Sequence, residues 1–120
     1  MTSSFRVIPV PGPGAEDVVV ATSGPDEGAC FTGTEDGAIF RISHDGQQVE
    51  RVAHTGGRPL GIEIDLDGRL LVCDAHQGLL RVDTATGAVE RVVDSVAGTR
   101  MVFCNNAAVA SDGTVWFSDS

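Results

Sequence analysis

Carboxylate and amide side chains stand at two matched places in this sequence, each directly before a short apolar segment. Glu16 and Asp17 precede "VVV", and Asn105 and Asn106 precede "AAVA". Carboxylate and side-chain amide oxygens are the hard donors that Ca²⁺ prefers. If the two pairs meet in the fold, they make an oxygen-rich cation site. Taken one at a time, however, Asp and Asn are simply common at the ends of strands and in turns.

An internal repeat shows how the two pairs could meet. Residues 40–52, "FRISHDGQQVERV", align without a gap on residues 80–92, "LRVDTATGAVERV". Each copy is typical of two short strands around a polar turn, and another pair of short apolar segments lies upstream of each. Four strands every forty-odd residues indicate a β-propeller blade. A β-sandwich is the other all-β possibility, but it gives no reason for the sequence to repeat at a fixed interval.

The repeat therefore predicts an all-β protein made of about two and a half four-stranded propeller blades. The expected parts are an N-terminal extension (1–14), a first blade (15–58), a second blade (59–103) and the first half of a third (104–120). Propellers close with about four to eight blades. We therefore expect the chain to be an N-terminal piece of a longer protein, or else a shortened product that self-associates through its exposed blade faces.

The antiparallel order of a blade sorts its loops onto two rims. The tight Asp-Gly turns fall on one rim, where ordinary turn chemistry explains them. The other rim collects the segments that open the innermost strands and point toward the central channel. Glu16 and Asn105 are therefore the leading candidates for metal ligands. Arg58 lies on the same rim, and so does His76, for which a solvated loop histidine is the simpler interpretation. The same rim is expected to carry Glu35, Asp36, Asp74 and Asp119.

Composition limits the possible partners and compartment. Seventeen acidic residues against eight basic ones give a net charge of -9, which disfavours nucleic acid and anionic membranes as partners. No apolar segment approaches the roughly 20 residues that span a bilayer, and the N-terminus has no hydrophobic signal core. Cys30, Cys73 and Cys104 lie in or beside apolar segments without CxxC spacing, so we expect buried reduced thiols and a cytoplasmic protein.

Three motifs, "RPLG", "DAHQGLLRVD" and "DGTVWFSDS", resemble the strictosidine-synthase-like group. That group belongs to the superfamily of senescence marker protein (regucalcin), gluconolactonases and paraoxonases, and the resemblance runs from about Ala15 to the end of the chain. It implies a six-bladed propeller with a divalent metal, usually calcium, in the axial channel. It also implies hydrolysis of a small-molecule lactone or aryl ester, with the metal polarising the carbonyl.

By this resemblance, Glu16 matches the first metal ligand and Asn105 matches the Asn of the family's "ND" motif. Asn106 stands where the family has Asp, which removes a carboxylate that could support the site. Asp17 and Asn106 then belong to the surroundings of the metal or the substrate. Arg58 and His76 become candidates for substrate contact. No residue is identified as a general base, and the remaining ligands would come from other blades, so we expect the chain alone to be inactive.

Two other functions stay open at this point. One is a propeller that binds a partner without catalysis, because the architecture hosts many functions. The other is a condensing enzyme like strictosidine synthase itself, although no residue of this sequence points to that chemistry.

Overall fold

The computed structural model describes residues 4–120, which form twelve strands and no helix. Two four-stranded antiparallel sheets follow the order of the chain. The first sheet contains β1 (Val18–Val20), β2 (Cys30–Gly33), β3 (Ala38–Ile42) and β4 (Val49–His54). The second contains β5 (Pro59–Ile64), β6 (Leu70–Asp74), β7 (Gly78–Val82) and β8 (Val89–Val93). Within this part of the chain, no helix is long and apolar enough to cross a membrane.

A third sheet is the antiparallel pair β11 (Cys104–Val109) and β12 (Val115–Asp119). Between the second and third sheets lies a short hairpin, β9 (Ser95–Val96) and β10 (Thr99–Arg100), which the sequence analysis did not predict. Its turn places Ala97 at φ 51° and Gly98 at φ 82°. Two consecutive positive φ values suit the tight hairpin turns that match strand twist, but the pair "AG" is a weak sequence signal for them.

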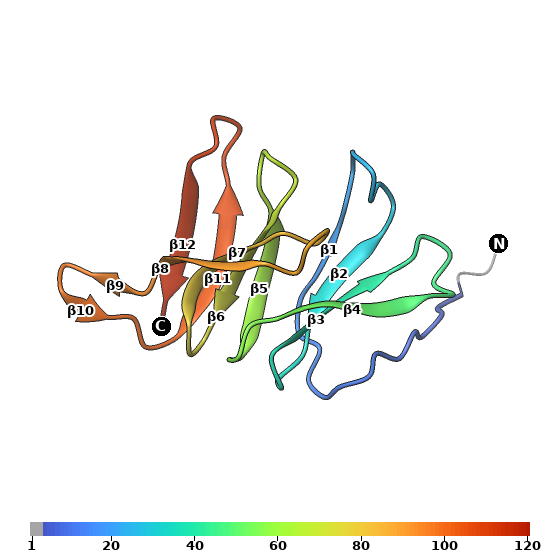
Figure 1. Cartoon of the computed structure of the whole chain (residues 1–120), viewed down its shortest axis with the longest axis horizontal. Helices are drawn as coiled ribbons and strands as arrows, with labels where there is room; N and C mark the ends of the chain where they lie inside the picture. The colour runs from blue at the N-terminus through green and yellow to red at the C-terminus, as the bar shows by residue number, and fades with distance from the viewer. Residues whose placement is uncertain (1–3) are drawn as a thin grey trace.

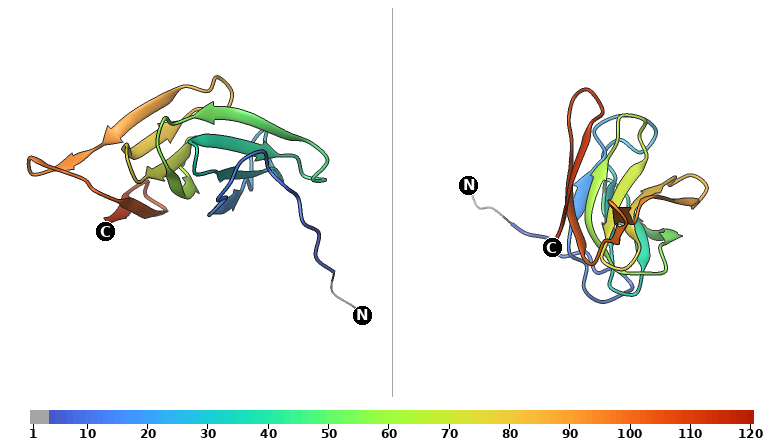
Figure 2. Two further views of the ribbon diagram at one scale, coloured as in Figure 1. Left: turned by 90° about the horizontal axis from the view of Figure 1, so that it is seen from below. Right: turned by 90° about the vertical axis from the view of Figure 1, so that its left-hand side faces the viewer.

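The three sheets lie side by side like the blades of a fan (Figure 1). β5 contacts β1 on one side and β11 on the other. β4 and β8 lie on the outer side of the fan, away from these three strands (Figure 2, left). The innermost strands of successive blades are therefore neighbours, which is the arrangement of a β-propeller, and the prediction of an all-β propeller fold is confirmed.

The hydrophobic core lies between the blades. One buried cluster joins the first two sheets and includes Phe31, Ile39, Ile62, Leu70, Val72 and Val82. A second joins the second and third sheets and contains Cys73, Leu79, Met101, Cys104 and Ala107. Burying one large aliphatic or aromatic side chain is worth about 1.5–3 kcal/mol. Packing between neighbouring blades therefore stabilises the arrangement and sets how closely the innermost strands approach.

The three cysteines are free thiols. Cys73 and Cys104 are fully buried, as expected from their apolar surroundings. Cys30 is only partly buried, so the expectation of three buried thiols is wrong for this residue. It is the first residue of β2, where the strand emerges from the loop and is less completely covered.

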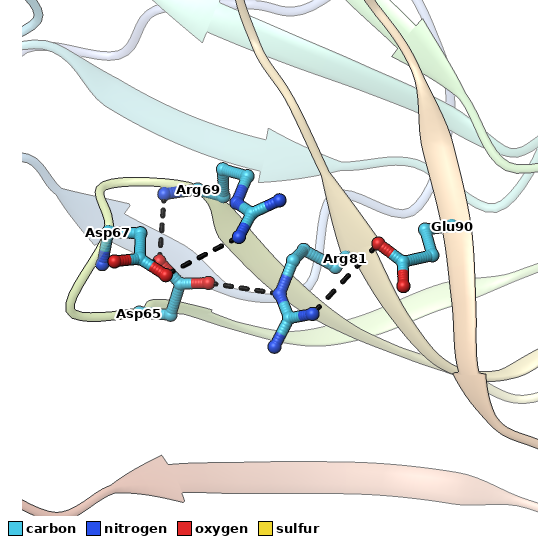
Figure 3. Close-up of polar contacts among 5 residues, drawn as sticks. All are labelled: Asp65, Asp67, Arg69, Arg81 and Glu90. Carbon is cyan, nitrogen blue, oxygen red and sulfur yellow. Dashed lines mark hydrogen bonds and ion pairs between the residues drawn. The ribbon is translucent and has the colours of Figure 1, made fainter. Parts of the chain in front are cut away.

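The repeated Arg and Glu residues form equivalent cross-strand ion pairs in the two blades. Arg81 on β7 lies opposite Glu90 on β8, and its Nη1 is 3.9 Å from Glu90 Oε2. Arg41 and Glu50 form the same pair in the first blade, at 3.3 Å. Arg81 Nε also contacts Asp65 Oδ2 at 3.1 Å, which joins the β5–β6 turn to the outer strands (Figure 3). The repeated Arg and Glu therefore occupy facing positions on the third and fourth strands.

Candidate metal centre

The strand register gives Glu16–Asp17, residues 60–61 and Asn105–Asn106 equivalent positions in three successive blades. The residue that directly follows each pair faces the third residue of the second strand in its own blade. Val18 faces Thr32, Ile62 faces Val72, and Ala107 faces Phe117. In the second and third blades the register shifts within this stretch, between Pro59 and Ile62 and between Cys104 and Ala107. Such bulges bend a strand and re-aim its side chains.

These equivalent positions border one cavity of about 320 Å³, lined by Glu16, Asp17, Gly61, Glu63, Asn105 and Asn106. The structure therefore brings together the four candidates: Glu16 and Asp17 directly before β1, and Asn105 and Asn106 near the start of β11. It adds two residues of β5, Gly61 and Glu63, that the sequence analysis did not identify. Every polar side chain around the cavity ends in a carboxylate or an amide.

Asp17 fastens the first blade to the second. Its Oδ2 accepts the backbone N–H of Ile62 at 2.9 Å, and its Oδ1 accepts the N–H of Val18 at 2.9 Å. At the equivalent place in the third blade, Asn106 Oδ1 accepts the N–H of Ala107 at 3.0 Å. Positions 17 and 106 therefore support the backbone where it enters the innermost strand.

Gly61 permits the close approach of the second and third blades. A Cβ atom at this position would lie 2.8 Å from the Asn105 carbonyl oxygen and 2.8 Å from Asn106 Oδ1. Real Cβ atoms do not come so close to other atoms, so any side chain here would push β11 away. The two asparagines keep their place on the cavity because residue 61 has no side chain.

Glu63 is the carboxylate that the sequence analysis missed. Its side chain is half-buried on β5, and burial together with the nearby negative charge of Asp17 raises the pKa of its carboxyl group. The available signal was its place in "LGIEI". Residues two apart on a strand share a face, so the one charged residue of this segment shares the cavity face with Gly61.

Glu16 is held by an ion pair at the edge of the cavity. Its side chain is 50% exposed, and Oε2 lies 3.7 Å from Arg58 Nη2. Arg58 Nη1 donates a hydrogen bond to the carbonyl of Gly14 at 3.0 Å. Arg58 thus lies on the predicted rim and contacts a candidate ligand, although it does not line the cavity itself.

His76 does not join the other candidates. It is exposed and borders a separate hollow with Ala75, Arg100, Met101 and Val102. Arg100 Nη2 donates to the His76 carbonyl at 3.1 Å, so this contact uses the backbone and leaves the imidazole out. A contact between His76 and a substrate stays a prediction.

The other acidic residues of this rim mainly accept hydrogen bonds from nearby loops and strand ends. Asp74 is fully buried, and its Oδ1 accepts the backbone N–H groups of Arg58, His76 and Gln77 at 2.9–3.0 Å. Asp119 accepts the N–H of Phe103 at 2.6 Å. Asp36 accepts the hydroxyl of Thr34 at 2.5 Å, and this bond lowers the pKa of the Asp36 carboxyl. These side chains do not line the cavity.

The donor chemistry fits a hard divalent cation, but the set of ligands is incomplete. Three carboxylates and two amides surround one cavity, and burial, together with the negative charge of Asp17, raises the pKa of Glu63. A bound cation would relieve that repulsion. Within residues 4–120, however, no three His, Cys, Asp or Glu side chains come together closely enough to hold a metal. The second blade offers only buried Leu60 at the position equivalent to Glu16 and Asn105.

Comparison with known proteins identifies homologues, although no family model matches the chain. Strictosidine synthase-like protein 4 of Arabidopsis thaliana is 36% identical over 99 residues, covering 79% of this chain and 27% of that protein. The adipocyte plasma membrane-associated protein of Danio rerio is 38% identical over 107 residues, covering 75% of this chain and 25% of that protein. The chain thus spans about a quarter of the length of these relatives.

Solved structures share the fold. A protein proposed to be a gluconolactonase superposes with a TM-score of 0.77 at 25% identity, over 95% of this chain and 39% of that one. A gluconolactonase from Xanthomonas campestris superposes with a TM-score of 0.68 at 27% identity, over 76% of this chain and 31% of that one. The chain belongs to the superfamily of strictosidine-synthase-like proteins and gluconolactonase-type propellers, as its sequence motifs predicted.

Proposed function

We propose that this chain contributes the first ligands of an axial calcium site in a propeller hydrolase that acts on lactones or aryl esters. The observation that carries the proposal is the cavity on which oxygen-bearing side chains of three neighbouring blades converge. The likeness to a gluconolactonase at 27% identity supports the substrate class. Calcium fits better than a soft metal because the donors are carboxylate and amide oxygens.

Each residue of the cavity has a distinct role in this proposal. Glu16 and Asn105 bind the metal from the first and third blades, and Asp17 holds the first blade in register with β5. Glu63 adds negative charge that favours a cation. Calcium, when bound, would polarise the carbonyl of the ester or lactone. The chain spans about a quarter of its relatives, so we assign the remaining ligands and the group that activates water to other blades.

A thermal melt with calcium chloride and with EDTA tests the metal site. A ligand that binds only the native state stabilises it by about 2.7 kcal/mol at a hundredfold excess over Kd. We expect calcium to raise Tm, and Glu16→Gln and Asn105→Ala to abolish the rise. Glu90→Gln is the matched control because it removes one carboxylate from the outermost strand of the second blade, beside Arg81. A calcium shift that survives both site substitutions contradicts the assignment.

Activity is a separate measurement. The hydrolase proposal expects EDTA-sensitive hydrolysis of lactones or aryl esters by a protein that carries the remaining blades, and no turnover by the 120 residues alone. Turnover by these residues alone, blocked by EDTA, would show that the ligand set is already sufficient. Calcium binding without hydrolysis by the longer protein would contradict the enzymatic part of the proposal.

A propeller that binds a partner without catalysis is the second candidate. Two observations favour it: the ligand position of the second blade carries buried Leu60, and position 106 carries an amide where the family has a carboxylate. This alternative predicts a Tm that is insensitive to both calcium and EDTA.

A further inference from the structure

We infer that Arg58 is an internal counter-ion of Glu16, which calcium must displace before Glu16 can act as a ligand. The inference rests on the proposed metal site and deepens it, because it names the residue of this chain that tunes the affinity of the site for calcium. It also assigns to Arg58 a role in positioning Glu16.

The geometry places Arg58 where it can perform this role. The backbone of Arg58 is held from two sides: its N–H donates to buried Asp74 at 2.9 Å, and its carbonyl accepts the N–H of Ala75 at 2.9 Å. The guanidinium is then anchored by the Gly14 carbonyl at 3.0 Å and reaches Glu16 Oε2 at 3.7 Å. The arginine side chain is 22% exposed, against 50% for Glu16, so it is the more constrained partner.

The charges around the cavity make this ion pair distinctive. Three of the lining residues, Glu16, Asp17 and Glu63, carry carboxylates, and none of the six lining residues carries a positive charge. Within residues 4–120, Arg58 is the cation that forms an ion pair with one of these carboxylates. Its guanidinium therefore supplies part of the positive charge that a metal would bring to Glu16.

Two cations compete for one carboxylate. Calcium coordination at Glu16 would bring a double positive charge close to the guanidinium, and the repulsion adds to the loss of the ion pair. Because the pair is partly exposed and its charges are screened by water and salt, the effect is modest. Removing the charge of Arg58 should tighten calcium binding about two- to fivefold.

Titration calorimetry with calcium chloride tests the inference, on a protein that carries the remaining blades and on three Arg variants of that protein. Arg58→Gln should lower the Kd for calcium about two- to fivefold, whereas Arg58→Lys, which keeps the charge, should stay close to the unchanged protein. Arg69→Gln is the control because it removes an equal charge from an exposed ion pair with Asp67 on the opposite rim. It should leave the Kd unchanged. Circular dichroism of each variant in EDTA checks that the fold is retained.

The outcomes separate this inference from the proposed function. If Glu16→Gln abolishes calcium binding but Arg58→Gln leaves the Kd unchanged or weakens it, the metal site stands and the counter-ion role is overturned. If Arg69→Gln tightens binding as much as Arg58→Gln, the effect is one of net charge, which also overturns it. If neither the unchanged protein nor Arg58→Gln binds calcium, both the inference and the proposed function fail.

Discussion

Asp17 Oδ2 accepts the backbone N–H of Ile62 at 2.9 Å, so a side chain of the first blade is hydrogen-bonded to the innermost strand of the second. Asp17 directly follows Glu16, the first candidate ligand. This bond therefore fixes where the start of the first blade lies relative to the cavity. The candidate site depends on such contacts between blades as much as on the side chains that line it.

Asp17→Ala should lower the free energy of unfolding by about 1.5–3 kcal/mol, the usual contribution of a hydrogen bond to a charged group. Urea denaturation in EDTA measures the change. The control Asp112→Ala removes an exposed carboxylate that accepts one N–H within its own turn, from Thr114 at 2.9 Å, and should cost less than half as much. Equal losses for the two variants would show that the bond between blades carries no special weight.

Glu63→Gln should stabilise the protein at pH 7 but not at pH 3.5. The pKa of Glu63 in the folded state is raised above its ordinary value of 4.5 by burial and by the charge of Asp17. As pH rises past 4.5, the unfolded chain loses this proton before the native state does, so native stability falls across that interval. Glutamine has no proton to lose. Urea denaturation at both pH values in EDTA checks this, and an equal gain at both would contradict the electrostatic cause.

Gly61→Ala should destabilise the protein by about 1–3 kcal/mol, the typical cost of overpacking. The added Cβ would meet the Asn105 carbonyl and Asn106 Oδ1, each at 2.8 Å. Because β11 must move to make room, calcium affinity should fall together with stability. Thermal melts with EDTA and with calcium chloride separate the two effects. A fully stable variant with unchanged affinity would mean that β11 does not approach β5 this closely.

Asp74→Ala should be the most damaging substitution of an acidic residue, with a loss of at least about 3 kcal/mol. It would leave the N–H groups of Arg58, His76 and Gln77, and the hydroxyl of Thr55, without their shared acceptor. Asp74→Asn keeps one acceptor oxygen and should recover part of the loss. Urea denaturation compares the two, and equal stability of the alanine variant and the unchanged protein would contradict this account.

Cys30 should react first with a thiol reagent such as DTNB. Its side chain is partly exposed, whereas Cys73 and Cys104 are fully buried. The pKa of the Cys73 thiol is also raised, mainly because Cys73 donates a hydrogen bond to Cys104 and in addition because it is buried. The native protein should therefore release about one equivalent of thionitrobenzoate quickly, and the rest only in urea. Cys30→Ser should remove the fast phase, and a fast phase that persists in this variant would contradict the burial of the other two thiols.

The sequence alone was sufficient to predict the class of fold and to single out four of the six residues that line the cavity. The signals for the fold are local: a forty-residue repeat, short apolar segments and turns that contain glycine. Each blade is built from one continuous stretch of chain, so these local signals are enough to predict it. The repeated Arg and Glu of "FRI" and "VERV" lie opposite each other because hairpin register is set by its turn. The positions of Glu16 and Asn105 also followed from strand order, because innermost strands must begin on one rim.

Contacts between blades were decided only by the tertiary structure. Glu63 lines the cavity, Gly61 admits β11, Arg58 pairs with Glu16, and Asp74 is buried where it accepts the N–H of Arg58. Each of these facts depends on where one strand bulges and how closely the neighbouring blade packs against it. Such packing joins residues about forty positions apart, and no local pattern records it. The sequence therefore determines which residues can reach the axis, and the packing of the blades determines which of them meet.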